Sequence, residues 1–170
     1  MGQHTAFGKL QSRNGWRVLS RRARKFQDAS QIAKYVTGRM LPKVILHPSI
    51  QDEVWLAFVR GNFDVAVFLA MKQVALRSAC EGGDEMLGDA LVTLAFKPNG
   101  GILTDTTRPR SEIEACQLLF KGALGSCKNP QSHRHVNIRD PAEAIELVLL
   151  ANHLLRIIDT RSAALTTSQS

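Results

Sequence analysis

The stretch "DPAEAIELVLLANHLLRIID", residues 140–159, has the features of a long buried helix. Asp140 stands in an N-cap position, and Pro141 follows in the first turn, where proline is tolerated. Apolar side chains then occupy nearly every face, which is the pattern of a helix at the centre of a bundle. We therefore predict a central helix that runs to about Asp159.

Apolar residues at helical spacing, N-cap residues and glycine stops predict further helices upstream. They are expected over residues 48–60, 62–82, 84–96 and 111–127, with Ser111 and Glu114 in capping-box positions in the last of them. No strand pattern of useful length and no internal repeat is visible. The predicted fold class is an all-α bundle of four to five helices over residues 44–161, with an N-terminal arm, 1–43, and a disordered tail, 162–170.

The three cysteines, Cys80, Cys116 and Cys127, lack the spacing of a metal finger. Cys116 and Cys127 fall on the predicted buried stripe of residues 111–127, so packing is favoured over catalysis for both. Reduced thiols, the absence of a secretory signal and the lack of an apolar run of about 18 residues predict a cytoplasmic protein without a membrane span. No cofactor and no metal are expected.

The positive charge of the chain is concentrated in its N-terminal arm. Residues 1–43 hold ten Lys and Arg against Asp28 alone, whereas the remainder has twelve cations and fourteen acids. Trp16 and Phe26 are interleaved with these cations, a composition suited to phosphate backbones. Nucleic-acid contact and a solvated, partly disordered tail both remain open, and a short amphipathic helix before Pro42 fits either one.

The segment "KNPQSHRH", Lys128–His135, places two cations and two histidines just after a predicted helix. Pro130 cannot continue that helix, so His133 and Arg134 are expected in a surface connection close to Lys128. A histidine near its ordinary pKa of about 6.5 can take a proton from a 2′-hydroxyl while cations hold the phosphate.

Two other interpretations of this segment remain. Cys127, His133 and His135 could bind a metal, but their spacing is unusual and no fourth ligand is obvious. The histidines could also be ordinary surface residues of a capped turn.

A resemblance to a known family adds to this pattern. "LHPSI", "GNFDVAVFLAMKQV" and "LLFKGALGSCKNPQSHRHVNIRDPAEAIELVLLANHLLRIID" resemble the Ymh-type prokaryotic proteins, which occur near phage, plasmid and restriction loci. The match runs from about Leu46 to Arg161. That family is similar in turn to the HEPN superfamily, helical bundles marked by an Arg, usually a polar residue, and a His four to six positions after the Arg.

The resemblance implies a HEPN-like fold and metal-independent RNA cleavage, commonly at the interface of a homodimer, in a toxin, phage-defence or mobile-element context. It implies Lys128, Asn129 and His133 as catalytic residues, with Arg134, His135 and Lys121 binding the substrate. RNA and a possible antitoxin or other protein are the implied partners.

The chain departs from the pattern at Lys128, where the family has arginine, and at Leu69 and Ala75, where relatives often carry acids. The alternative to an active enzyme is therefore a degenerate helical module that binds RNA or a protein.

Overall fold

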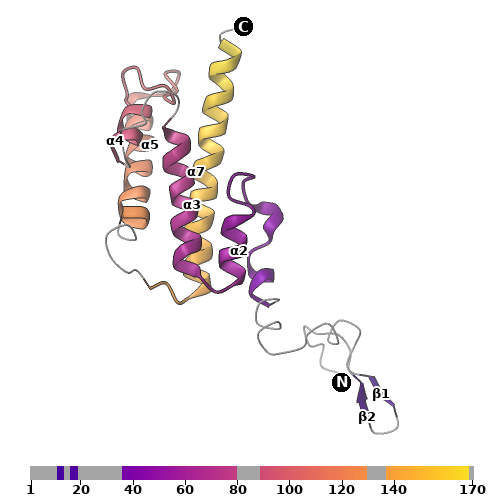
Figure 1. Cartoon of the computed structure of the whole chain (residues 1–170). Helices are drawn as coiled ribbons and strands as arrows, with labels where there is room; N and C mark the ends of the chain where they lie inside the picture. The colour runs from indigo at the N-terminus through magenta and orange to yellow at the C-terminus, as the bar shows by residue number, and fades with distance from the viewer. Residues whose placement is uncertain (1–10, 14–15, 19–35, 80–88, 130–136, 169–170) are drawn as a thin grey trace.

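The computed structural model describes five stretches of the chain, and most of their residues are helical (Figure 1). The described residues are 11–13, 16–18, 36–79, 89–129 and 137–168. They include the helices α2, α3, α4, α5 and α7, which share one apolar core. The prediction of a helical bundle is thus confirmed. Among the described residues, no helix combines the length and the apolar composition that crossing a membrane requires.

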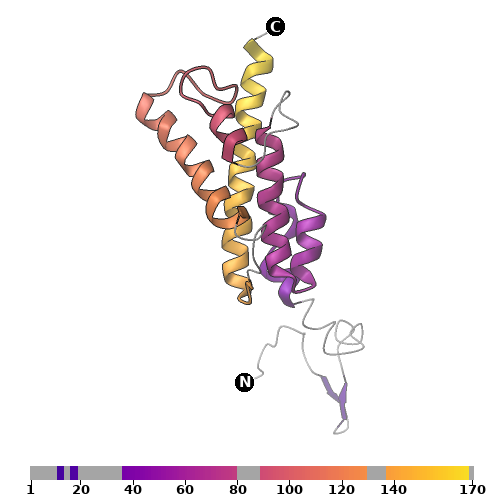
Figure 2. The ribbon, with the colours of Figure 1, turned by 60° about the vertical axis from the view of Figure 1, so that its left-hand side comes forward.

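The two longest helices described, α7, Pro141–Ser168, and α3, Phe63–Ser78, lie along each other in both ribbon views (Figures 1 and 2). The buried side chains of α7 recur at intervals of three and four residues, as expected for a face that packs against other helices. These are Ala144, Val148, Ala151, Asn152, Leu154, Leu155 and Ile158. The prediction that the last helix is central is wrong: α3 packs against α7, α2, α4 and the segment that follows α5, whereas α7 packs mainly against α3.

The predicted start of α7 is confirmed, but its predicted end is wrong. At the start, Asp140 accepts a hydrogen bond from the Ala142 N–H at 2.9 Å, so the predicted N-cap is confirmed. At the other end, the helix does not stop at Asp159 but continues to Ser168, so the loose tail predicted for 162–170 is wrong up to that residue. No glycine or proline follows Asp159 to end the helix.

The helix α2, Glu53–Val59, starts later than predicted. Residues 48–52 form turns instead of a first helical turn at Pro48. The reason is local: the Ser49 N–H donates to Nδ1 of His47, and the Ile50 N–H donates to the His47 carbonyl, which closes a tight turn. Gly61 ends the helical segment as predicted, with a φ of 82° that suits glycine.

The helices α4, Asp89–Ala95, and α5, Arg110–Ala123, form the other side of the bundle, and the rings of Phe96 and Phe120 stack at 4.2 Å between centroids. The predicted capping box is wrong. The helix α5 begins before Ser111, and Glu114 instead pairs with Arg110 at 2.8 Å.

The buried stripe predicted for this helix is confirmed at Phe120 and Ala123, and the two cysteines on it are partly buried. Burial raises the pKa of the Cys116 thiol, and the lowering effect of Arg108 is smaller. A raised pKa keeps a thiol protonated at neutral pH, which agrees with a packing role.

The described parts of the arm contain a small antiparallel ribbon, which the sequence pattern did not predict. The strands β1, Gln11–Arg13, and β2, Trp16–Val18, form this ribbon. Residues 36–40 are helical and end before Pro42, as expected for that part of the arm. Leu41 is fully buried in the core, so the packed domain begins before the predicted boundary at residue 44.

We expect Phe120→Ala to lower the free energy of unfolding by about 3–5 kcal/mol, because Phe120 is fully buried against Phe96 and its removal leaves a cavity. Leu118→Ala, on the same helix but 65% exposed, is the control and should change stability by no more than about 0.5 kcal/mol. Urea denaturation followed by circular dichroism measures both. Equal losses for the two variants would contradict this placement of α5.

Candidate functional site

The helix α5 continues without a break into a π-helical segment, η3, Leu124–Lys128. In a π-helix each N–H donates to the carbonyl five residues earlier, and the Asn129 N–H donates to the Leu124 carbonyl in this way. Gly122 and Gly125 weaken the regular α-helix here, and the Ser126 hydroxyl donates back to the Gly122 carbonyl at 2.6 Å. Single π turns inside helices are found frequently at functional sites.

Two of the predicted catalytic residues lie at the end of this segment. Lys128 is the last residue of η3, and Asn129 is its C-cap; both side chains are partly buried. Lys121, also partly buried, lies on the last turns of α5. The structure therefore joins these three residues through one continuous helical segment.

The other predicted site residues, His133, Arg134 and His135, lie outside the described residues, so their approach to Lys128 stays a prediction. Ile138 is 7% exposed and belongs to the core, which anchors the far end of the connection between η3 and α7. Asn129 and Ile138 thus bound the part of this connection that lies outside the described residues.

The segment η3 packs against α3, and Leu124 is fully buried at this contact. On α3, Ala75 is buried and Leu69 is partly buried against the core. Both positions, where relatives often carry acids, are thus occupied here by apolar packing side chains. An unpaired carboxylate at Ala75 would be costly to bury.

A polar network, which the sequence analysis missed, ties the turn at residues 47–50 to α7 and α3; His47 and Asn152 are its buried members, and Arg77 and Asp159 are partly exposed. His47 is 5% exposed, and its Nε2 lies 2.6 Å from Oδ2 of Asp159. Arg77 of α3 pairs with the other oxygen of Asp159. The backbone N–H of His47 donates to Oδ1 of Asn152 at 2.5 Å. We call these four residues the His47 network.

Hydrogen bonds on both ring nitrogens orient the His47 side chain. The Ser49 N–H and hydroxyl both lie within reach of Nδ1 of His47, at 3.2 and 2.8 Å, which assigns Nδ1 as an acceptor and Nε2 as the donor toward Asp159. Burial raises the pKa of the Asp159 carboxyl, but the hydrogen bonds and charges of His47 and Arg77 outweigh it and lower the pKa below its usual range.

Serine, histidine and aspartate in a row invite comparison with a nucleophilic triad, in which the serine hydroxyl bonds the histidine base and the aspartate orients it. Here Ser49 and His47 belong to one tight turn. Neither residue lines the cavity between α7 and the loop before α5. The network is therefore an architectural link between three elements. A signal for it was present in the sequence, since Asn152 and Asp159 are polar residues seven apart in an apolar helix.

The fold and the helix-end pair of Lys128 and Asn129 define a helical-bundle protein with a polar site after a π turn. A family model described as "Protein of unknown function (Hypoth_ymh)" matches residues 45–158, most of the chain, and the chain belongs to this family. No curated protein and no solved structure matches the chain.

We expect the stability of the wild-type protein to fall more steeply in acid than that of Asp159→Asn. A carboxyl whose pKa is lowered on folding stabilises the native state above its unfolded pKa of about 3.9, and that stability is lost as the pH falls through the lower folded pKa. Urea denaturation from about pH 6 to pH 2.5 measures the difference, which should shrink below about pH 4. If the free energy of unfolding of the two proteins changed equally with pH, Asp159 would not stabilise the fold through this network.

Proposed function

We propose that this protein is a HEPN-like, metal-independent endoribonuclease acting in a phage-defence, toxin or mobile-element context. The observation that carries the proposal is the pair Lys128 and Asn129 at the end of a π-helical segment, directly before the connection that contains His133. A cation and an amide at a fixed helix end, followed within a short connection by a histidine, are the groups that RNA cleavage without a metal requires.

In this mechanism His133 is the general base. It takes the proton of a ribose 2′-hydroxyl, the 2′ oxygen attacks the adjacent phosphorus, and the bond from phosphorus to the 5′ oxygen breaks. The products are a 2′,3′-cyclic phosphate and a 5′ oxygen, which takes a proton from water to become a hydroxyl. Lys128 and Arg134 hold the phosphate and its growing negative charge, and Asn129 fixes the turn or bonds the substrate. Lys121 and His135 extend the contact along the RNA backbone.

The basic arm supports RNA as the partner. Its ten cations supply the sequence-independent attraction to phosphates that a small helical domain otherwise lacks, because the rest of the chain has a small excess of acids. The arm thus adds affinity, and the residues after η3 carry the chemistry.

A second candidate function is a degenerate module that binds RNA or a protein without cleaving it. Two observations favour it: lysine stands at position 128, and Leu69 and Ala75 are packing residues. Lysine is a point charge that cannot grip a phosphate with two parallel hydrogen bonds, as arginine does.

We expect His133→Ala to abolish RNA cleavage in EDTA at neutral pH with little change in RNA affinity, because a neutral imidazole adds little attraction to phosphate. Lys128→Arg should preserve or raise cleavage, since guanidinium keeps the charge and restores the two-pronged grip. Gel analysis of mixed RNA incubated with purified protein measures the products.

The matched control is Lys97→Arg, the same change at an exposed lysine away from the motif, and it should have no effect. Cleavage that appears only with Lys128→Arg would identify a degenerate site. The wild type, His133→Ala and Lys128→Arg could also all bind RNA without cleaving it. That result would support the binding module and contradict the ribonuclease.

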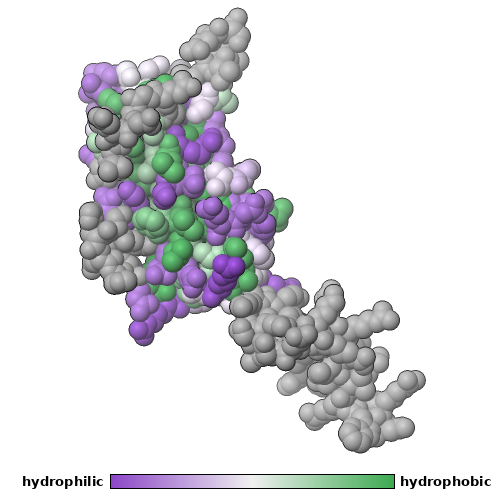
Figure 3. Space-filling model, viewed as in Figure 1, coloured by the Kyte–Doolittle hydropathy of each residue, from purple (hydrophilic) through white to green (hydrophobic). Residues whose placement is uncertain are grey.

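A homodimer is part of the proposal, and α3 offers the surface for it. Val65 and Leu76 are 43% and 53% exposed, and they share one side of α3 with the partly buried Phe68 and Leu69. The exposed Lys72 interrupts this row, and we call the four apolar residues the α3 stripe. Apolar side chains gather along the middle of the face drawn in Figure 3, over α3. Because η3 packs against α3, two copies joined through the α3 stripe would bring both Lys128 residues to one groove.

We expect Leu76→Glu to convert a dimer into a monomer, because the substitution puts a charge on the most exposed apolar side chain of the stripe. The matched control, Leu118→Glu, introduces the same charge at a more exposed leucine on α5, away from the stripe, and should remain dimeric. Light scattering at tens of micromolar protein measures the mass. A monomeric wild type, or two variants that behave alike, would contradict the α3 stripe as the interface.

A further inference from the structure

The antiparallel ribbon of the arm, formed by β1 and β2, has a register that follows from its sequence (Figure 1). Its Cα partners are Gln11 with Val18, Ser12 with Arg17, and Arg13 with Trp16. Only Asn14 and Gly15 separate the two strands in the sequence, and Asn-Gly is strongly preferred in two-residue hairpin loops. The sequence between the strands and the pairing of the strands therefore both indicate a hairpin.

The register divides the residues of the ribbon between its two faces. Residues paired across an antiparallel ribbon share a face, and successive residues along a strand alternate between the faces. Arg13 and Trp16 therefore belong to one face, and Arg17 belongs to the opposite face. One face thus combines an aromatic residue with a cation, whereas the other carries a cation without an aromatic residue.

The charge of the surrounding sequence favours a polyanion as the partner of the ribbon. Arg21, Arg22, Arg24 and Lys25 follow β2 within seven residues, and the whole arm holds ten cations against one acid. Cations in such number attract a chain of phosphates, because each neutralised phosphate releases bound counterions. A single small anion could engage only a few of these cations.

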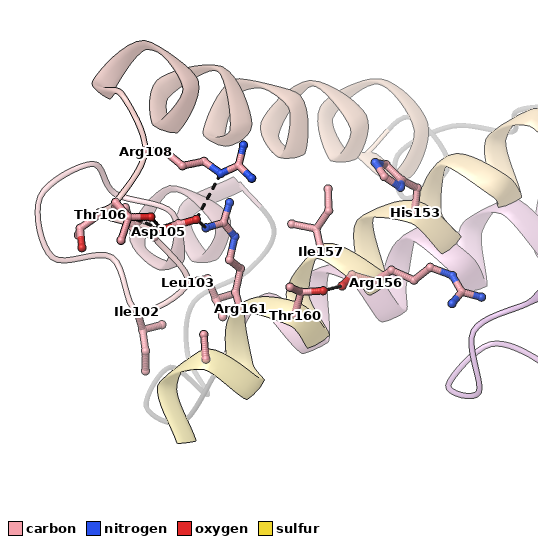
Figure 4. A pocket seen from close by; sticks show the side chains of 13 residues that line it. Ile102, Leu103, Asp105, Thr106, Arg108, His153, Arg156, Ile157, Thr160 and Arg161 are labelled. Carbon is pink, nitrogen blue, oxygen red and sulfur yellow. Dashed lines mark hydrogen bonds and ion pairs between the residues drawn. The ribbon is translucent and has the colours of Figure 1, made fainter. Parts of the chain in front are cut away.

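The folded domain offers less positive charge to such a partner. In the cavity between α7 and the loop before α5, Arg108 and Arg161 meet at Asp105 (Figure 4), and Arg108 also pairs with Glu112 at 3.0 Å. That end of the cavity is therefore electroneutral. Residues 44–170 as a whole hold twelve cations and fourteen acids, so the arm provides the main attraction for a polyanion.

We propose that the ribbon binds single-stranded RNA, with an unpaired base stacked on Trp16 and the adjoining phosphate held by Arg13. Every base has an aromatic face, so stacking on a tryptophan tolerates any sequence, as the attraction of the cations does. A base inside a duplex is already stacked on its neighbours, and the major groove of double-stranded RNA is too deep and narrow for side chains to read. The face that carries Trp16 therefore selects unpaired RNA.

This inference rests on the proposal that RNA is the partner, but it does not require cleavage. The ribbon captures the RNA, and the residues after η3 carry out the reaction, so either role can fail without the other. Binding is therefore measured with RNA whose 2′ oxygens are methylated. Such RNA has no 2′-hydroxyl proton for His133 to take, so it stays intact during the measurement.

The test is fluorescence anisotropy of the full chain with a labelled 2′-O-methyl RNA of roughly 12 nucleotides, single-stranded or paired with its complement. We expect the single strand to bind ~10-fold more tightly than the duplex, because only the single strand offers unpaired bases. Trp16→Ala should remove this preference and leave duplex binding unchanged, since the duplex contacts only the cations. Trp16→Phe should keep most of the preference, because phenylalanine also has an aromatic face.

The matched pair of variants is Arg13→Gln and Arg17→Gln, which remove the same charge from opposite faces of the ribbon. If both arginines contact phosphates, each variant should reduce the log-log salt slope for the single strand by roughly 0.7. Only Arg13→Gln should also reduce the preference for the single strand over the duplex.

Stacking on Trp16 is also measured directly by fluorescence. The chain contains two tryptophans, so in Trp55→Phe the emission comes from Trp16 alone. We expect the unlabelled single strand to quench this emission and the duplex to quench it little. Circular dichroism confirms that each variant is folded.

Equal binding of the single strand and the duplex by the wild type would overturn the proposal. A preference that Trp16→Ala leaves intact, or that Arg13→Gln and Arg17→Gln reduce equally, would overturn it as well. If neither RNA binds, RNA is not the partner and the inference is also wrong. If the single strand is preferred through Trp16 while ordinary RNA stays uncleaved in EDTA, the proposed ribonuclease fails and this inference holds.

Discussion

The packing of α3 against α7 is the contact on which the other elements depend. One helix with apolar residues on most of its faces cannot be covered by one partner, so α3 lies along it and the remaining helices complete the core. Large fully buried side chains such as Leu154, Leu155 and Ile158 each contribute roughly 1.5–3 kcal/mol when they leave water. The helices α2 and α4 then pack against α3, and α5 reaches α3 through η3 and α7 directly.

The His47 network adds direction to this apolar packing. Apolar contacts alone would allow α7 to slide or rotate against its neighbours, because they are not directional. Asn152 and Asp159 are seven residues apart on α7, and both bond His47 in the turn before α2. Since His47, Arg77 and Asp159 can satisfy one another in one arrangement only, they set the register of α7 against α3 and that turn.

The proposed functions occupy two separate parts of the chain. After α5, the π-helical turn delivers Lys128 and Asn129 to the connection that leads back to α7. In the arm, the pairing of β1 with β2 places Arg13 and Trp16 on one face of a ribbon. The first arrangement depends on the packing of η3 against α3, whereas the second depends on residues that are at most seven positions apart in the chain.

The sequence by itself determined the helical class, the N-terminal boundary of the last helix and the partial burial of Cys116 and Cys127. These follow from the period of apolar residues and from local caps such as Asp140, which act within a few residues of the chain. It also indicated Lys128 and Asn129 as residues at a helix end, since Pro130 marks that end.

Only the tertiary structure decided the partners that lie far apart along the chain. His47 and Asp159 are 112 residues apart, and no spacing rule relates a turn to a distant helix. Glu114 does not cap α5 together with Ser111 but forms an ion pair with Arg110. The helix α7 continues beyond its predicted end at Asp159, because no glycine or proline there breaks it. The pairing of Arg161 with Asp105, and with it the cavity, likewise exists only because the fold brings a loop and a helix together.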